Sequence, residues 1–295
     1  MSITIVLLVI FSSILHVIWN LNLKRSTIKD LYMSLALVSA TLLFLPLGIF
    51  TWFQVDMSFK YWVFVAGTTI LHLIYFLCLA YSYEDNDFSV AYPVARGVGI
   101  TLTPILSILI LAERPTLLGI VAIMGIIFGA YFIFFIPGSR VFSINSFRVI
   151  FFRRQVLMAF IAAISTALYH VWDKEILNSV DAFPLPALYM YLMIAGISVC
   201  VIPLMLKKYT TSEIIVFGRE NILSICVTGI LLFSVYGSIL TLMTFVPLSY
   251  LGPTREVGIV ISVLTGIVFF KEKLNSTKII GVLLILFGVV TMSQV

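Results

Sequence analysis

The chain has 295 residues, of which 61% are hydrophobic and only 11% are charged. Its mean hydropathy of +1.16 is far above that of a soluble domain of this length, which excludes a large soluble domain. A membrane helix needs about 20 apolar residues, so the chain has room for about ten such helices and their connections. The composition therefore predicts an all-α integral membrane protein.

The formal net charge of +5 does not by itself indicate nucleic-acid binding, because Lys and Arg collect in the loops of membrane proteins. We expect no nucleic-acid partner. The three cysteines, Cys78, Cys200 and Cys226, stand far apart in apolar runs, a spacing that predicts neither a disulfide framework nor a metal site. Phosphate-binding, zinc-protease and serine-hydrolase motifs are also missing, so we expect no cofactor, no metal and no catalytic residue.

Ten apolar stretches follow one another along the chain, and none alternates as a transmembrane strand would. They cover residues 3–23, 31–53, 61–82, 88–112, 116–136, 155–173, 186–206, 222–245, 248–270 and 278–293. We therefore expect ten transmembrane helices. The first stretch is longer than a signal-peptide core and lacks a small-residue cleavage pattern, so we expect it to be retained.

The Lys and Arg residues between these stretches predict the orientation. The odd-numbered connections hold thirteen of them, whereas the even-numbered connections hold three. Since Lys and Arg are enriched in cytoplasmic loops, the odd-numbered connections should be cytoplasmic. The expected location is the plasma (cytoplasmic) membrane, with multiple passes and with both termini outside.

The two halves of the chain resemble each other. Three correspondences share an offset of 159 residues: Arg96 with Arg255, Glu113 with Glu272, and Gly129 with Gly288. Two more share an offset of 153 residues: Trp19 with Trp172, and Asn20 with Asp173. Because each half holds an odd number of helices, the copies would be inverted in the membrane. We expect two inverted five-helix repeats, residues 1–137 and 155–295, joined by a basic cytoplasmic connection, residues 138–154.

Short motifs strengthen this picture. Glu-Arg-Pro-Thr (residues 113–116) and Glu-Lys-Leu-Asn (residues 272–275) precede the last helix of each half, and the first helix contains His16, Trp19 and Asn20. With five helices in each half, the chain resembles an EamA-type member of the drug/metabolite transporter superfamily over essentially its whole length. The resemblance implies an inverted-repeat secondary transporter without an ATP-binding part. It also implies a central cavity lined chiefly by the first, third, fourth, sixth, eighth and ninth helices.

Polar residues form a stripe on the first expected helix. Ser12, His16 and Asn20 recur every four residues, with Trp19 beside them, so they share one face. Polar groups inside a membrane either line a site or form hydrogen bonds between helices, and both interpretations stay open. We take His16, Trp19 and Asn20 as candidate substrate-binding residues.

The third and fourth expected helices supply further candidates. His72 stands near the middle of the third helix, with Tyr75 on the same stripe. Such an imidazole could bind substrate, relay a proton or hydrogen-bond to a neighbouring helix. On the fourth helix, Tyr92 and Arg96 flank Pro93, which removes a backbone hydrogen bond beside a positive charge. An arginine at that depth must pair or face water, so we expect Arg96 at the site.

The second half adds Arg255 and Glu256, which follow Pro253 near the start of the ninth expected helix. They form either part of the site or a charge pair under the outer headgroups. Adjacent helical residues point about 100° apart, so both should not face one cavity equally. Glu256 is the candidate proton carrier. The last candidates are aromatic residues that could also belong to a membrane belt: Tyr169, Trp172 and Tyr236.

These residues favour a secondary active transporter, importer or exporter, of a small polar metabolite by alternating access. Two arginines favour an anionic or zwitterionic substrate, because a guanidinium fork pairs well with such groups. The expected partners are this substrate, the lipid bilayer and a proton as coupling ion, in a monomer or homodimer. An intramembrane enzyme, which would need a nucleophile with a base, and a non-transporting receptor or assembly subunit are the alternatives.

Overall fold

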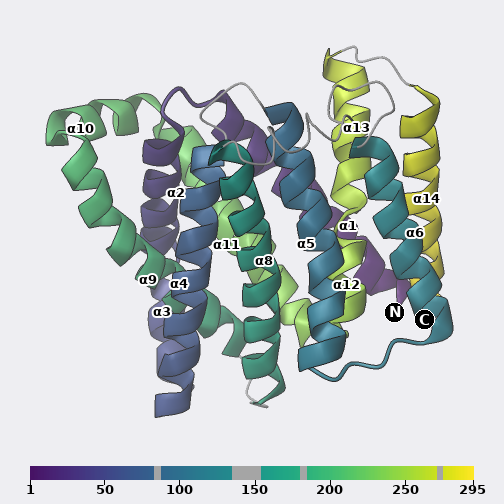
Figure 1. Ribbon diagram of the computed structural model, residues 1–295. Coiled ribbons are helices and arrows are strands. Elements are labelled where there is room, and N and C mark those ends of the chain that lie inside the picture. The colour runs from purple at the N-terminus through teal and green to yellow at the C-terminus, as the bar shows by residue number, and fades with distance from the viewer. Residues whose placement is uncertain (83–87, 135–153, 180–184, 271–274) are drawn as a thin grey trace.

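The computed structural model describes residues 1–82, 88–134, 154–179, 185–270 and 275–295 (Figure 1). Inside the helices, the description leaves out the side chains of residues 88–96, 134, 155, 265, 266 and 268–270. Within these ranges every regular element is a helix, which confirms the expected all-α class. The first half contains α1 (Ile3–Arg25), α2 (Lys29–Leu43), α3 (Leu45–Trp52), α4 (Phe59–Ser82), α5 (Phe88–Ile110) and α6 (Leu117–Phe134). The second half contains α8 (Arg154–Asn178), α9 (Leu185–Lys208), α10 (Thr211–Glu220), α11 (Ile222–Met243), α12 (Leu248–Thr254), α13 (Val257–Phe270) and α14 (Ser276–Met292).

Helix length and hydropathy support several membrane crossings. In the described part of the chain, five helices are long and apolar enough to cross a membrane: α1, α4, α8, α9 and α11. A sixth span results if α2 and α3, which meet at an angle of 50°, cross together. The described part of α5, together with α6 and α14, forms shorter apolar helices. Length and composition thus establish five to six spans directly, fewer than the ten expected.

Two of the expected continuous helices are broken, and each break lies beside a proline. The stretch 31–53 divides at Phe44, with Pro46 in the first turn of α3. The stretch 248–270 divides at Arg255 and Glu256, just after Pro253 in α12. There the Glu256 amide donates to the Pro253 carbonyl at 2.9 Å, a tighter turn than that of an α-helix. Since proline cannot donate a backbone hydrogen bond, it favours both breaks.

One helix was not expected. The segment between the seventh and eighth apolar stretches contains α10, whose start is stabilised by a capping box. The Thr210 side chain accepts from the Glu213 amide at 3.3 Å, and the Thr210 amide donates to the Glu213 carboxylate at 2.7 Å. The amide and the hydroxyl of Thr210 both donate to the Glu213 carboxylate, which lowers the pKa of Glu213.

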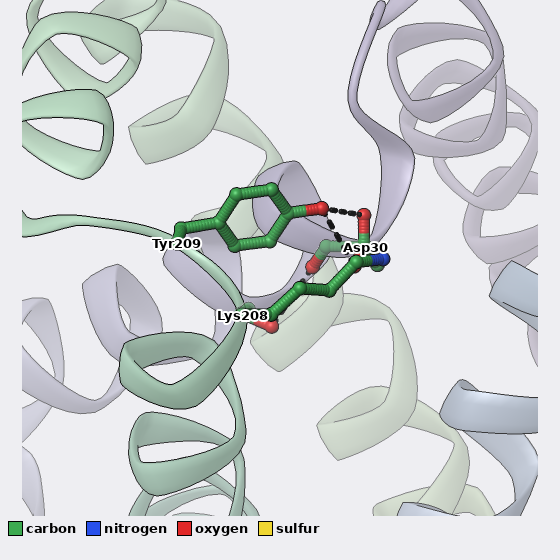
Figure 2. Close-up of polar contacts among 4 residues, drawn as sticks. Asp30, Lys208 and Tyr209 are labelled. Carbon is green, nitrogen blue, oxygen red and sulfur yellow. Dashed lines mark hydrogen bonds and ion pairs between the residues drawn. The ribbon is translucent and has the colours of Figure 1, made fainter.

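A polar cluster ties α2 to the end of α9, near α10. Figure 2 shows the side chains of Lys208 and Tyr209 converging on Asp30. The Lys208 ammonium lies 2.6 Å from one carboxylate oxygen of Asp30, and the Tyr209 hydroxyl donates to the other at 2.7 Å. Burial, and then the hydrogen bond to Asp30, raises the pKa of Tyr209, so its hydroxyl stays a donor at neutral pH.

The first helix turns its polar stripe toward the protein. Ser12, Ser13 and Trp19 are buried, whereas Ile14 and Ile18 are 38% and 40% exposed. Exposed isoleucines suit a face in contact with lipid, and buried polar groups suit a face toward other helices. The stripe of α1 is therefore positioned to line an internal site.

Candidate functional site

A cavity lies inside the bundle where α1, α4, α8 and the α12–α13 break face one another. Four side chains line both of its parts: His16, Tyr75, Tyr169 and Arg255. The first part adds polar groups from several elements, namely Asn20, Thr103, Thr166, His170 and Glu256. The second part is more apolar and adds Trp19, His72, Met190, Met193 and Tyr236. One continuous site thus has a charged part and an aromatic part.

Arg255 is held at the helix break by contacts from two other helices. Its Nη1 lies 2.7 Å from Nε2 of His170 on α8, and its carbonyl accepts from the Ser13 hydroxyl of α1 at 3.0 Å. Because a guanidinium only donates, Nε2 of His170 must accept. A neutral His170 therefore carries its proton on Nδ1, which is buried without a partner among the described residues. The Arg255 guanidinium and the Nδ1–H group of His170 thus both supply hydrogen-bond donors in the charged part of the cavity.

Glu256 lines the same part of the cavity as Arg255 and is 8% exposed. The sequence expectation was that these neighbours would diverge, as they do on a regular helix. The break at this point changes the backbone path, so both side chains line one cavity. Their surroundings are internal rather than at the headgroup level, since His170 and His16 line the same space.

The aromatic part is built around His72. Its Nδ1 lies 3.0 Å from the Thr68 carbonyl, which can only accept, so Nδ1 carries the proton. The ring stacks on Tyr169, with 3.8 Å between centroids, and meets the edge of Tyr236 at 4.9 Å. Nε2 of His72 is buried without a partner among the described residues and is an acceptor when the imidazole is neutral.

The candidates on α1 form a local chain of hydrogen bonds. The Trp19 indole donates to Nδ1 of His16 at 3.2 Å, and the Asn20 amide donates to the His16 carbonyl at 2.8 Å. These contacts orient the imidazole of His16, which lines both parts of the cavity. All three residues proposed from the stripe therefore lie at the site.

Two residues on α8 with notable contacts were not among the candidate site residues predicted from the sequence. His170 holds Arg255, and Asp173 accepts hydrogen bonds from Tyr189 and Tyr236. A signal was present in the sequence, because Thr166, His170 and Asp173 recur at intervals of four and three residues and so share a helix face.

Two family matches decide the identity of the chain. Residues 153–294 match the EamA-like transporter family, and residues 51–127 match the Small Multidrug Resistance protein family. The second half of the chain is EamA-like, and by both matches the chain is a membrane transporter of the drug/metabolite transporter superfamily. The resemblance inferred from the sequence motifs is thereby confirmed. The EamA-like protein is a multi-pass membrane protein, and its family relationship identifies it as a drug/metabolite transporter.

A solved structure described only as "Crystal structure of protein" supports the fold of the EamA-like protein. It shares 14% identity, covers 99% of this chain and 96% of its own, and has a TM-score of 0.72. At that identity the likeness concerns the fold alone. No curated protein matches the EamA-like chain significantly.

Trp172, another candidate of the EamA-like protein, is not among the residues that line this cavity. Trp172 donates to the Phe64 carbonyl at 2.9 Å and its ring lies against Gly67, so it packs between α8 and α4. The side chains of Tyr92 and Arg96 on α5 lie outside the described residues. Their proposed roles stay predictions.

Two charged side chains of the EamA-like protein, Lys174 and Glu113, bind backbone groups at helix termini. Lys174 is buried and donates to the carbonyls of Met243 and Val246 where α11 ends. Glu113 accepts from the amides of Leu248 and Ser249, at 2.7 and 2.8 Å, where α12 begins. A cation at a helix C-terminus and a carboxylate at an N-terminus both satisfy unpaired backbone groups. Glu113, which precedes α6 in the chain, thus has a structural role at α12.

Proposed function

We propose that this EamA-like protein is a secondary active transporter of a small polar metabolite with a carboxylate or similar anionic group. The observation behind this proposal is the pairing of Arg255 with His170, a neutral partner, at the broken helix. Among the described residues, no carboxylate lies within ion-pair distance of Arg255. Within the part of the chain that the structure describes, its positive charge is therefore not neutralised by an ion pair, and a guanidinium in that state favours an anionic ligand.

The aromatic part of the cavity supports a zwitterionic substrate rather than a plain anion. Tyr75, Tyr169 and Tyr236 line that part together with His72, and Nε2 of His72 is an acceptor without a partner among the described residues. Aromatic faces attract a cationic amine, and a neutral imidazole nitrogen accepts its proton in a hydrogen bond. The carboxylate would lie at Arg255 and the amine toward His72.

Helix contacts support the proposed inverted repeat. If each helix of the first half is paired with its counterpart, α1 corresponds to α8, α2 to α9, α4 to α11 and α5 to α12–α13. The contact of α4 with α8 then maps onto that of α11 with α1, and the contact of α2 with α11 maps onto that of α9 with α4. Inverted halves of this kind are the usual basis of alternating access. The repeats proposed are residues 1–137 and 155–295.

In an alternating cycle, the contacts of Lys174 and Glu113 would break when the end of the bundle at which they lie opens. Both groups bind backbone atoms at helix ends rather than each other's side chains. Water can replace such contacts at an exposed helix end. Glu256, inside the cavity, is the candidate carrier of a coupling proton.

Uptake by purified protein in liposomes tests the proposal. A radiolabelled panel of amino acids, organic acids, sugar phosphates and amines would be offered with and without a proton gradient. We expect uptake or exchange of at least one compound that carries a carboxylate, and none in protein-free liposomes. Transport confined to cations without an anionic group would contradict the substrate class. Absence of any transport in both directions would contradict the function.

A further inference from the structure

Asp173 places a carboxyl group inside the bundle with none of its surface exposed. The Tyr189 hydroxyl of α9 donates to one oxygen at 2.7 Å, and the Tyr236 hydroxyl of α11 donates to the other at 2.5 Å. Among the described residues, no Lys, Arg or His nitrogen lies within ion-pair distance of it. Burying an ionised carboxylate without an ion pair is costly, so such a group in a membrane helix calls for a functional explanation.

The two tyrosines allow Asp173 to exist in both protonation states. A tyrosine hydroxyl can donate or accept. When Asp173 is ionised, both hydroxyls donate to it. When it is neutral, its own O–H can donate to one tyrosine oxygen while that tyrosine's hydrogen turns away. A proton can therefore be gained or lost here by rotation of a hydroxyl, without a shift of the helices.

Tyr236 connects Asp173 to the cavity. Its ring lines the aromatic part, while its hydroxyl reaches the carboxyl group. Other titratable or charged groups lie in this part of the bundle: Tyr61, His72 and Tyr75 on α4, Tyr189 on α9, Tyr236 on α11, and Arg255 and Glu256 after α12. On α8 itself stand Tyr169, His170 and Lys174, of which Lys174 is directed to the end of α11. The described part of α5, residues 97–110, contributes none.

We propose that Asp173 is a proton-binding site that couples substrate transport to a proton gradient, with Tyr236 as the link to the cavity. This inference rests on the proposed transport function. Since the substrate carboxylate and an ionised Asp173 carry like charges, occupancy at Arg255 favours the neutral form of Asp173. By thermodynamic linkage, the proton then favours the anionic substrate equally. The expected result is movement of proton and substrate in the same direction.

Infrared spectroscopy of the full-length protein in liposomes, without substrate, tests the proton site directly. As the pH falls, we expect a carboxylic-acid carbonyl band to appear in the wild type. The band should be lost in Asp173→Asn and kept in Glu220→Gln, a control variant of an exposed acid on α10. If the pH-dependent bands are the same in Asp173→Asn and wild type, the proposal is overturned.

A second variant covers the case in which Asp173→Asn does not fold. Tyr236→Phe removes one donor to the ionised carboxylate, so the acid band should appear about one to two pH units higher than in the wild type. Tyr189→Phe should act in the same direction. A band with an unchanged midpoint in both variants would overturn the role of the two hydroxyls.

Proton movement separates this inference from the transport function. Liposomes that contain the pH-sensitive dye pyranine would receive the panel compounds used for uptake. Substrate-dependent proton entry in the wild type and its loss in Asp173→Asn, with exchange of labelled compound retained, would support coupling at Asp173. Proton entry equal to wild type in that variant would overturn it. If the band titrates but no compound is transported, the transport function fails while the proton site stands.

Discussion

The contacts of Arg255 suit the ligand-binding role proposed for it. A carboxylate partner would neutralise the guanidinium and compete with an anionic substrate. His170 instead offers one neutral acceptor, at 2.7 Å, and leaves the positive charge in place. The Ser13 hydroxyl fixes the backbone of Arg255 from a second helix. The side chain is thereby positioned before any substrate arrives, which reduces the ordering cost of binding.

Replacement of Arg255 tests this role. Arg255→Ala should weaken the apparent affinity for a transported carboxylate about 10- to 100-fold, because a hydrogen bond to a charged group contributes about 1.5–3 kcal/mol. Arg255→Lys should retain part of the affinity, since it keeps the charge but not the fork. The concentration dependence of liposome uptake gives both values. Arg219→Ala, at an exposed arginine of α10, is the control and should match the wild type. Wild-type affinity in Arg255→Ala would exclude a direct role.

Residue types at the site could be predicted from the sequence, but their partners could not. The stripe on α1 predicted His16 and Asn20, because helical spacing alone places them on one face. The pairing of Arg255 with His170 joins positions 85 residues apart, and no local pattern shows it. The depth of Arg255 in the membrane could not be predicted either. Counting residues along a straight helix ignores the break after Pro253.

At the scale of the elements, the lengths of the apolar runs predicted where the long helices lie. They did not predict where those helices break or where the short helix α10 begins. Pro46 and Pro253 stand at the two breaks, so both irregularities had a visible cause. The capping box of Thr210 and Glu213 was likewise present in the sequence ahead of α10. Hydropathy overlooks such a helix because its residues are too polar for a membrane span.

The close packing of α6 against α14 requires glycine at position 129 more than at position 125. A Cβ at Gly129 would lie 2.7 Å from the Gly281 carbonyl oxygen, whereas a Cβ at Gly125 would meet nothing nearer than 3.5 Å. Gly129→Ala should therefore push the helices apart, costing about 1–3 kcal/mol and lowering the thermal unfolding midpoint in detergent. Gly125→Ala, one turn away on the same face, should leave the midpoint unchanged or raise it, because alanine favours helix. Equal midpoints for the two variants would contradict this packing.

At the scale of the whole molecule, the proposed repeat of the two halves has support from both sequence and structure. One family match covers residues 51–127 in the first half, and the other covers residues 153–294 in the second. Sequence offsets of 159 and 153 residues already predicted a repeat, and the mirrored helix contacts support it in three dimensions. The offsets could not predict the cavity itself, since its charged and aromatic parts combine residues from both halves.

The distribution of Lys and Arg over the folded molecule predicts its orientation. Lys24, Arg25, Lys208 and Arg219 lie where α1 ends, where α9 ends and on α10, and Figure 1 shows the two termini close together and away from α10. Because Lys and Arg favour the cytoplasmic side, we expect the α10 end inside the cell and both termini outside.

Reporter fusions decide this orientation. Alkaline phosphatase fused after Val295 should be active, and green fluorescent protein fused there should be dark, because phosphatase folds outside the cytoplasm and the fluorescent protein inside. Fusions to chains truncated after Arg219 are the matched control and should show the reverse pattern. A fluorescent, phosphatase-negative carboxyl terminus would invert the orientation. The contacts of Lys174 and Glu113 would then lie at the cytoplasmic end rather than at the outer end.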